Sequence, residues 1–205
     1  MKGKLIIFEG ISGTGKETQA KLLKDSLAKK GITAHVVYHP TPEVKLLLSE
    51  WRRERSIDHI TEVYLFLADR YDRVRQGIKP ALERGEWVIS LRNYVSALVY
   101  QGKTEKDREW IRQEFARFEP ASDVLFYFHL SAEQAMARIA KRREVTGESL
   151  GTFETINALR EKEKAYAEVL NDIPHTVVDA SQSIEQIHVH LSTIISGGIR
   201  GEGTI

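Results

Sequence analysis

The sequence predicts an α/β fold in which helices cover both faces of a five-stranded parallel sheet. Short apolar runs alternate with long helical patterns along the whole chain. The first run, LIIF at residues 5–8, is apolar at every position, as expected for a parallel strand buried on both faces. The segments between runs are long enough to hold a helix, which is the pattern of repeated βαβ units.

The predicted elements follow one another in a regular order. After the first strand come a glycine-rich turn and an amphipathic segment, residues 16–31, with Gly31 as its C-cap. Four further strands are predicted by the runs TAHVVYH, WVISL, DVLFYFHL and HTVVDA, at 33–39, 87–91, 123–130 and 175–180. The longer helical patterns cover residues 58–84, 105–118, 131–143, 152–170 and 183–196. We expect one domain over residues 1–196 and a flexible, glycine-rich tail at 197–205.

The composition limits the classes of function. The formal net charge is only +1, so no overall basic field recruits nucleic acid or an anionic membrane. The chain has no cysteine, which excludes disulfides, thiolate metal sites and cysteine nucleophiles. No apolar run has the length of a signal peptide or a membrane span. We therefore expect a cytoplasmic protein that binds neither nucleic acid nor membranes.

The segment FEGISGTGKETQ, residues 8–19, has the spacing of a phosphate-binding loop. The frame Gly-x-x-x-x-Gly-Lys runs from Gly10 to Lys16. Its glycines let backbone N–H groups converge on an anion, and the following helix adds its N-terminal dipole. Lys16 can then reach the outer phosphates. The alternative interpretation is a glycine turn that only tightens a strand–helix junction.

The residue after this lysine is unusual. Such loops place Ser or Thr there, whose hydroxyl ligates Mg²⁺, whereas this chain has Glu17. Glu17 can ligate the metal itself, point away from the phosphates, or leave the role to the hydroxyl of Thr18. The segment GTGKETQAKLL resembles the nucleoside monophosphate kinases, in which a non-hydroxyl residue and then Thr commonly follow the lysine. The resemblance implies a site for ATP and Mg²⁺ built from Gly10, Ser12, Gly13, Thr14, Gly15, Lys16, Glu17 and Thr18.

A second cluster concerns the acceptor. In YLFLADRYDRV, residues 64–74, Phe66 and Arg70 are four positions apart in a predicted helix and share one face. An aromatic ring beside a guanidinium can stack on a flat base and hydrogen-bond its edge. Taken alone, the segment favours an ordinary amphipathic helix with a core phenylalanine and a surface arginine.

The ordered set of motifs resembles the thymidylate kinase family from residue 4 to about 195. The set comprises FEG with the phosphate loop, LFLADR, an arginine after the third strand, YQG, FE at 153–154 and VVDAS at 177–181. The resemblance implies a P-loop NTPase-type three-layer sandwich with a lid, and a homodimer. It implies transfer of the γ-phosphoryl group of ATP, with Mg²⁺, to the 5′-phosphate of a deoxynucleoside monophosphate, with dTMP as the first expectation.

The resemblance also assigns roles to acceptor-site residues. Phe66 is similar to the ring that stacks on thymine, and Arg70 to the arginine that bonds the base edge. Arg92 matches the arginine that holds the transferring phosphates. Tyr100 matches the tyrosine that crowds the 2′ position of the sugar, although it is equally compatible with a core tyrosine. The other residues implied at the acceptor are Glu9, Ser96, Ala97 and Gln101.

The last two regions concern the donor nucleotide. KRREVTGESLGT, residues 141–152, corresponds to the lid, whose Arg142 or Arg143 would close over the phosphates as charge develops. By composition alone this segment is a solvated loop. Arg138 and the pair Ala180–Ser181 fall where the family holds adenine, although Arg138 is equally compatible with a helix-surface ion pair.

Four positions depart from the family's usual pattern. Leu91 stands where an Asp helps to organise the metal, and Ser12 where an Asp contacts the 3′-hydroxyl. HPTP at residues 39–42 replaces Glu-Pro-Gly-Gly and removes an acidic residue. Ala97 replaces a hydroxyl or amide that reads the base. All four changes touch the metal or the acceptor, while the donor-phosphate loop is kept.

Two interpretations of these departures follow. In the first, the enzyme is active and Glu17 supplies the negative charge lost at Leu91, because a carboxylate on either side of Mg²⁺ keeps the local charge constant. In the second, the acceptor has shifted or the enzyme is weakened. The chain would then be a kinase for another deoxynucleotide or a nucleoside, or a nucleotide-binding protein without turnover.

Overall fold

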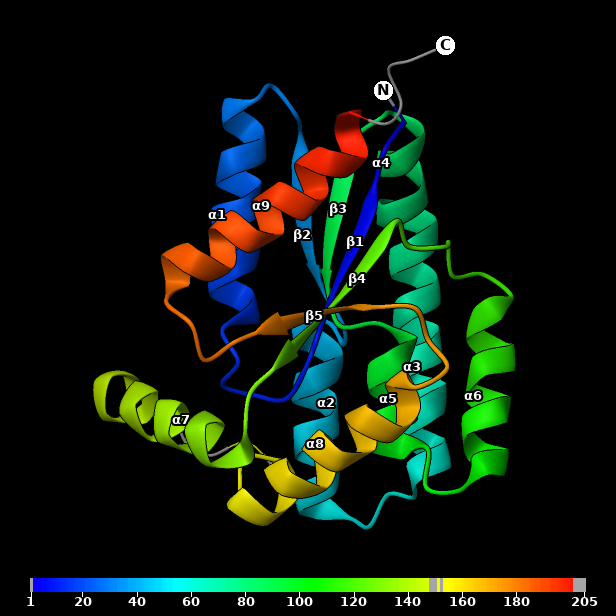
Figure 1. The fold of residues 1–205 in the computed structure, drawn as a ribbon. Helices are drawn as coiled ribbons and strands as arrows, with labels where there is room; N and C mark the ends of the chain where they lie inside the picture. Colours follow the sequence, from blue (N-terminus) through cyan, green and yellow to red (C-terminus); the bar gives the residue numbers. More distant parts are fainter. Residues whose placement is uncertain (1, 148–150, 152, 201–205) are drawn as a thin grey trace.

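The predicted strands form one sheet in the computed structural model, which describes residues 2–147, 151 and 153–200 (Figure 1). The strands are β1 (Leu5–Glu9), β2 (Ala34–Tyr38), β3 (Trp87–Leu91), β4 (Val124–His129) and β5 (Thr176–Asp179). Their order is β2-β3-β1-β4-β5, and every neighbouring pair is parallel. The prediction of a five-stranded parallel sheet between helices is confirmed.

Helices fill the connections between the strands. They are α1 (Lys16–Lys29), α2 (Pro42–Glu54), α3 (His59–Arg73), the π-helical turn η1 (Val74–Ile78), α4 (Lys79–Glu83), α5 (Tyr94–Gln101), α6 (Glu105–Ala116), α7 (Ala132–Thr146), α8 (Ile156–Leu170) and α9 (Ile184–Arg200). The predicted helix at 58–84 corresponds to α3, η1 and α4, which follow one another without a break.

The sequence patterns do not predict α2 and α5. Helix α5 has eight residues, six of which are buried, so it lacks the polar face that marks a surface helix. Helix α2 buries only Leu48. Its start is nevertheless well defined, because the side chain of Thr41 caps it and Pro42 occupies the first turn.

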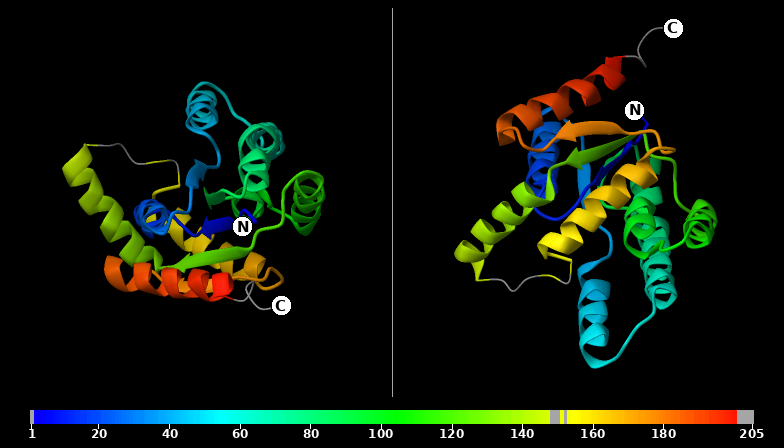
Figure 2. Two further views of the ribbon diagram at one scale, coloured as in Figure 1. Left: turned by 90° about the horizontal axis from the view of Figure 1, so that it is seen from above. Right: turned by 60° about the horizontal axis from the view of Figure 1, so that its bottom comes forward.

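The sheet lies between two helical layers. Helices α1 and α9 pack against each other on one side, while α5 packs against α3, α6 and α8 on the other (Figures 1 and 2). Strands β1 and β3 are buried at every position, which explains why all their residues except Glu9 and Ser90 are apolar.

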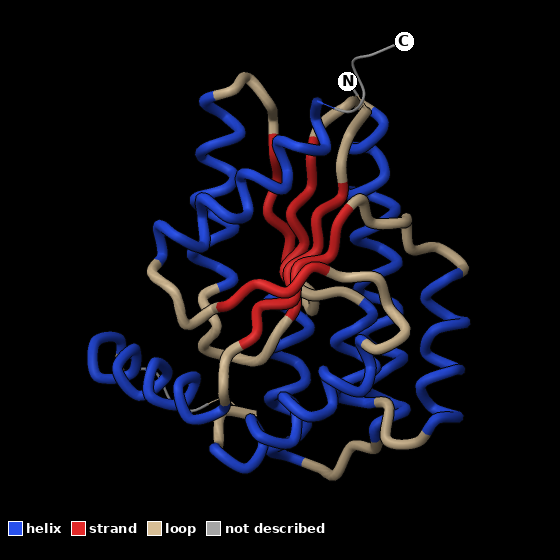
Figure 3. The backbone as a smooth tube through the Cα atoms, in the orientation of Figure 1, coloured by secondary structure: helices blue, strands red, loops and turns tan. Residues whose placement is uncertain are grey.

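The carboxyl ends of the strands define where a site can form. Figure 3 shows the strands gathered at the centre of the molecule, and in Figure 1 the arrows of β2 and β3 point toward the region of α2. The segments that follow β1, β2 and β3, at residues 10–15, 39–41 and 92–93, therefore meet at one edge of the sheet. Ligands of open parallel sheets bind at this edge.

Two predicted segments extend past the described residues. Helix α7 continues to Thr146 and ends at Gly147 with a left-handed φ of 70°, so the predicted lid begins as helix. Its residues 148–150 and 152 lie outside the described part. Helix α9 runs through residues 197–200 of the predicted tail, and 201–205 lie outside the described part. None of the described helices combines the length and apolar character needed to cross a bilayer.

Candidate active site

The loop between β1 and α1 has the backbone of an anion cradle. Gly10, Gly13 and Gly15 have φ values of 140°, 83° and 85°, which side-chain-bearing residues rarely adopt. A Cβ on Gly10 would lie 2.6 Å from the carbonyl oxygen of Phe128, and one on Gly13 would lie 2.7 Å from that of Ala135. These glycines therefore allow both the turn and the close approach of β4 and α7. The N-terminal N–H groups of α1 follow directly, as phosphate binding requires.

Lys16 is the buried cation of this loop. Its Nζ donates to the carbonyl oxygens of Gly10 at 2.9 Å and Ile11 at 2.7 Å, and to Oγ1 of Thr14 at 2.9 Å. Burial and the positive charge of Arg92 lower the pKa of Lys16 to about 7, against the opposing effects of Glu9 and Glu17. The loop thus holds the amine where it can turn toward an incoming phosphate.

The candidate metal ligands lie at the start of α1. Glu17 and Thr18 are both exposed in its first turn. Among the described residues, no three His, Cys, Asp or Glu side chains are grouped so that they could hold a metal ion. A carboxylate and a hydroxyl completed by phosphate oxygens and water nevertheless fit Mg²⁺, which is usually bound through few protein ligands.

The side chain of Leu91 lies in the hydrophobic core and offers no ligand for a metal ion. It is the last residue of β3, is 4% exposed, and pairs in the sheet with Phe8 and Tyr38. The chain therefore places an apolar side chain where the family pattern has a carboxylate. Ser12, the other substituted Asp position, is half-buried in the phosphate loop.

A buried polar network around Glu9 joins β1, α5 and α8. One carboxylate oxygen of Glu9 accepts hydrogen bonds from the backbone N–H groups of Asn93 at 2.8 Å and Ser96 at 3.2 Å. The other accepts from Oγ of Ser96 at 2.7 Å and from the hydroxyl of Tyr166 at 2.8 Å. Four donors compensate the burial of this fully enclosed carboxylate. The network fixes the start of α5 against the end of β1.

Arg92 enters the same network immediately after β3. Its Nη1 donates to Oγ of Ser96 at 3.0 Å and to the hydroxyl of Tyr166 at 3.1 Å, and its Nη2 to the hydroxyl of Tyr100 at 3.4 Å. Burial opposes its charge, but Tyr100, Tyr166 and Glu9 together raise the pKa of Arg92. Its φ of 75° is the only positive φ outside glycine among the described residues. Strain of this kind, held by surrounding contacts, is typical of functional sites.

The other two residues of α5 that were expected at the acceptor, Ala97 and Gln101, lie outside this network. Ala97 is 2% exposed and offers no polar group. Gln101 donates from Nε2 to Glu62 at 2.9 Å, whereas its Oε1 is buried without a partner in the described part of the chain. Glu62 in turn accepts from Arg52 of α2 at 2.7 Å. Gln101 thus lies in a separate network that connects α5 with α2 and α3.

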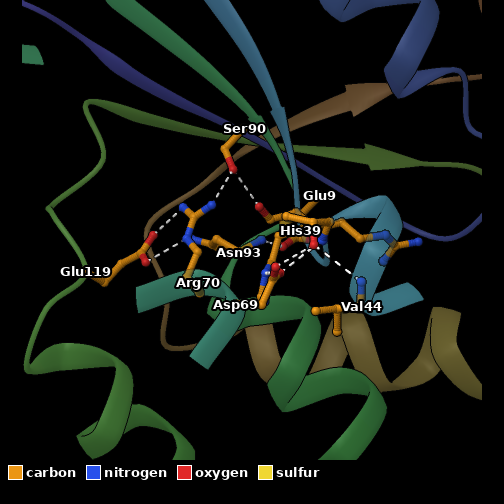
Figure 4. Close-up of polar contacts among 10 residues, drawn as sticks. Glu9, His39, Val44, Asp69, Arg70, Ser90, Asn93 and Glu119 are labelled. Atoms are coloured by element: carbon orange, nitrogen blue, oxygen red, sulfur yellow. Dashed lines mark hydrogen bonds and ion pairs between the residues drawn. The ribbon is translucent and has the colours of Figure 1, made fainter. Parts of the chain in front are cut away.

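Phe66 and Arg70 lie on the inner face of α3. Phe66 is 7% exposed and Arg70 is fully buried, so Arg70 is not the surface arginine of an ordinary amphipathic helix. Its Nε and Nη2 donate to the carboxylate of Glu119 at 2.9 and 2.6 Å, and its Nη1 donates to Oγ of Ser90 at 2.9 Å (Figure 4). This bidentate pair holds the guanidinium inside the fold.

The HPTP segment forms a polar cluster with Asp69 of α3. Asp69 Oδ2 accepts from the backbone N–H of Thr41 at 2.9 Å and lies 3.3 Å from Nδ1 of His39. Its Oδ1 accepts from Oγ1 of Thr41 at 2.6 Å. His39 is 4% exposed, and its ring centroid lies 5.7 Å from that of Phe66. Figure 4 shows His39 and Asp69 facing each other beside the Arg70 cluster.

The residues expected at the donor nucleotide lie on α7 and after β5. Arg138 is exposed on α7, and the backbone N–H of buried Ala180 donates to the carbonyl oxygen of His129 at 2.9 Å. Arg142 donates to Glu154 at 3.0 Å, which connects the two ends of the predicted lid. Arg143 is half-buried in the last turn of α7.

Sequence reasoning missed three residues of this region: Tyr166, His39 and Asp69. Tyr166 is separated from Glu9 by 157 positions, and nothing in the pattern of α8 distinguishes it from a core tyrosine. The signal for Asp69 was available, because it is three positions after Phe66 and therefore shares its helix face.

Comparison with known proteins shows a consistent likeness. A family model described as thymidylate kinase matches residues 8–191. A probable thymidylate kinase of Thermococcus kodakarensis is 33% identical over 200 residues, covering 93% of this chain and 96% of the relative. One of Thermococcus gammatolerans is 36% identical over 196 residues, covering 91% and 92%. The thymidylate kinase of Akkermansia muciniphila is 37% identical over 150 residues, covering 70% of each chain.

Proposed function

The chain belongs to the thymidylate kinase family, and we propose that it transfers the γ-phosphoryl group of ATP to dTMP, giving dTDP and ADP. The observation that carries this proposal is the network of Arg92, Ser96, Tyr100 and Glu9 at the sheet edge beside Lys16. Lys16 begins α1 and Arg92 follows β3, and the two side chains are close enough for their charges to interact, which suits a reaction that brings two phosphate groups together.

The chemistry proposed for these residues is positioning and charge stabilisation. The N–H groups of residues 10–18 and the amine of Lys16 bind the β- and γ-phosphates of ATP. Arg92 holds the acceptor phosphate in line with the γ-phosphoryl group, since the network around Glu9 fixes its guanidinium. Magnesium bound with ATP would neutralise phosphate charge, and Glu17 and Thr18 are the residues that would hold it. Arg142 and Arg143 of the lid add positive charge as the loose transition state forms.

The proposed acceptor site lies between α3 and α5. Phe66 stacks on the base, and Tyr100 crowds the 2′ position of the sugar, with its hydroxyl held by Arg92. On the donor side, Arg138 and the Ala180–Ser181 loop hold adenine. The expected cytoplasmic location and the absence of a nucleic-acid or membrane partner stay predictions, supported by the net charge of +1.

We also propose a homodimer formed through α3 and α6. Tyr64 is 61% exposed and its ring lies 5.4 Å from that of Trp110, while Tyr71 is 52% exposed and lies 5.5 Å from Phe118. Two aromatic pairs along one helical layer, each with an exposed tyrosine and a half-buried partner, are the kind of surface that associating proteins bury.

The test is ADP release from the wild-type protein, measured in a coupled assay with ATP, Mg²⁺ and a panel of dTMP, dUMP, dCMP and thymidine. We expect the highest kcat/KM with dTMP and loss of turnover in Lys16→Met. A higher kcat/KM with dCMP or thymidine than with dTMP would mean that dTMP is not the acceptor. The alternative from another class is a nucleotide-binding protein without turnover, which Glu17 and the apolar Leu91 favour. Such a protein would bind ATP in calorimetry and release no ADP with any acceptor.

A further inference from the structure

We propose that His39, oriented by Asp69, determines base specificity by accepting a hydrogen bond from the N3–H of a thymine or uracil base stacked on Phe66. The inference rests on the proposed function, because it names how the same acceptor site selects its base. It assigns a role to a segment, HPTP, in which this chain departs from the family pattern.

The position of His39 is the first argument. It follows β2 at the carboxyl edge of the sheet, and its backbone N–H donates to the carbonyl oxygen of Leu91 at 3.0 Å. Its ring is inclined at 68° to Phe66 and at 79° to Phe115. A base stacked parallel to Phe66 would therefore be inclined to the imidazole, and not parallel with it, so the two rings would not stack on each other.

The hydrogen-bonding state of His39 is the second argument. Burial works against the charge of Asp69, but hydrogen bonds from His39 and Thr41 lower the pKa of this carboxyl, so it is an acceptor only. The hydrogen shared with Asp69 must then belong to Nδ1 of His39. Burial lowers the pKa of His39, with Arg70 acting in the same direction and Asp69 and Glu119 opposing it. A neutral imidazole with a hydrogen on Nδ1 carries a lone pair on Nε2.

The hydrogen-bonding character of the side chains near Phe66 is the third argument. Arg70 is fully buried and directs three N–H donors to Glu119 and Ser90. Ala97 has no polar atom in its side chain. Arg70 has donors only and Ala97 has no polar group, so neither can accept a hydrogen bond from N3–H, whereas the lone pair on Nε2 of His39 can. Thymine and uracil present a donor at N3, whereas cytosine presents a second lone pair that His39 would repel.

The decisive variant is His39→Phe, which keeps a ring between Phe66 and Phe115 and removes the acceptor. Dissociation constants for dTMP and dCMP are measured by calorimetry, and kcat/KM where turnover allows. We expect dTMP affinity to fall about ten- to a hundredfold, dCMP affinity to stay or improve, and ATP affinity to stay within twofold. His35→Phe, at an exposed histidine of β2, is the matched control and should change none of these.

Further readouts separate recognition from support of the fold. His39→Gln keeps an amide oxygen and should recover part of the dTMP preference. The wild-type affinity for dTMP should fall as the pH drops through the lowered pKa of His39 and the imidazole takes up a proton, beyond any fall in His39→Phe. Equal losses for dTMP and dCMP, or an unchanged ratio between them, would overturn the inference. A wild type that prefers another acceptor would instead overturn the proposed function, and the nucleotide panel detects this before any variant is made.

Discussion

We predict that ATP binding is coupled to proton uptake by Lys16. The amine has a pKa of about 7 in the free protein because it is buried and lies in the field of Arg92. A bound polyphosphate supplies negative charge and should return this pKa toward its ordinary value of about 10.4. Between these two values the nucleotide-bound protein holds a proton that the free protein lacks. Binding must then take up protons from solution.

The size of the effect follows from these two values. At pH 8 the free amine is about one-tenth protonated and the bound amine almost fully, so binding takes up about 0.9 protons. At pH 6 the uptake falls to about 0.1 protons, since the free amine is already charged. The same linkage makes ATP affinity decrease as the pH rises, by about fiftyfold between pH 7 and pH 9.

The assay is titration calorimetry of ATP binding in buffers that have different ionisation enthalpies. The slope of the observed enthalpy against the buffer enthalpy gives the protons taken up, and Lys16→Met is the control in which this uptake should vanish. If the uptake at pH 8 is near zero, or is the same in Lys16→Met, then the assignment of the low pKa to Lys16 is refuted.

Three further predictions concern metal binding, stability and assembly. Glu17→Gln should lower turnover by orders of magnitude and raise the Mg²⁺ concentration needed for half activity; unchanged turnover would end its role as metal ligand. Glu119→Gln leaves the guanidinium of Arg70 without its charged partner and should cost about 3–5 kcal/mol in urea unfolding, whereas Glu114→Gln, which breaks a partly exposed pair, should cost under about 1 kcal/mol. Tyr64→Glu should yield monomers in light scattering, and an unchanged mass would exclude α3 from the interface.

Much of the fold could be predicted because its signals are local. Each strand is a short apolar run, so the five strands and most helices follow from the sequence patterns. Helix α5 escaped prediction because it is buried on nearly all sides and has no amphipathic period. The phosphate loop is likewise local, since Gly10 and Lys16 are six positions apart and their conformations follow from glycine and the helix start.

The acceptor side was determined only by tertiary structure. The sequence alone fixed which residue types are present, including Phe66, Arg70 and the HPTP segment. It could not show that Glu119, which is 49 positions from Arg70, forms an ion pair with the guanidinium of Arg70. Nor could it show that Asp69 meets His39 across 30 positions. The sequence pattern of a helix predicts which of its side chains point inward. The residues that these side chains contact depend on how α3, α5 and the strand ends pack, and this packing is determined by the whole chain.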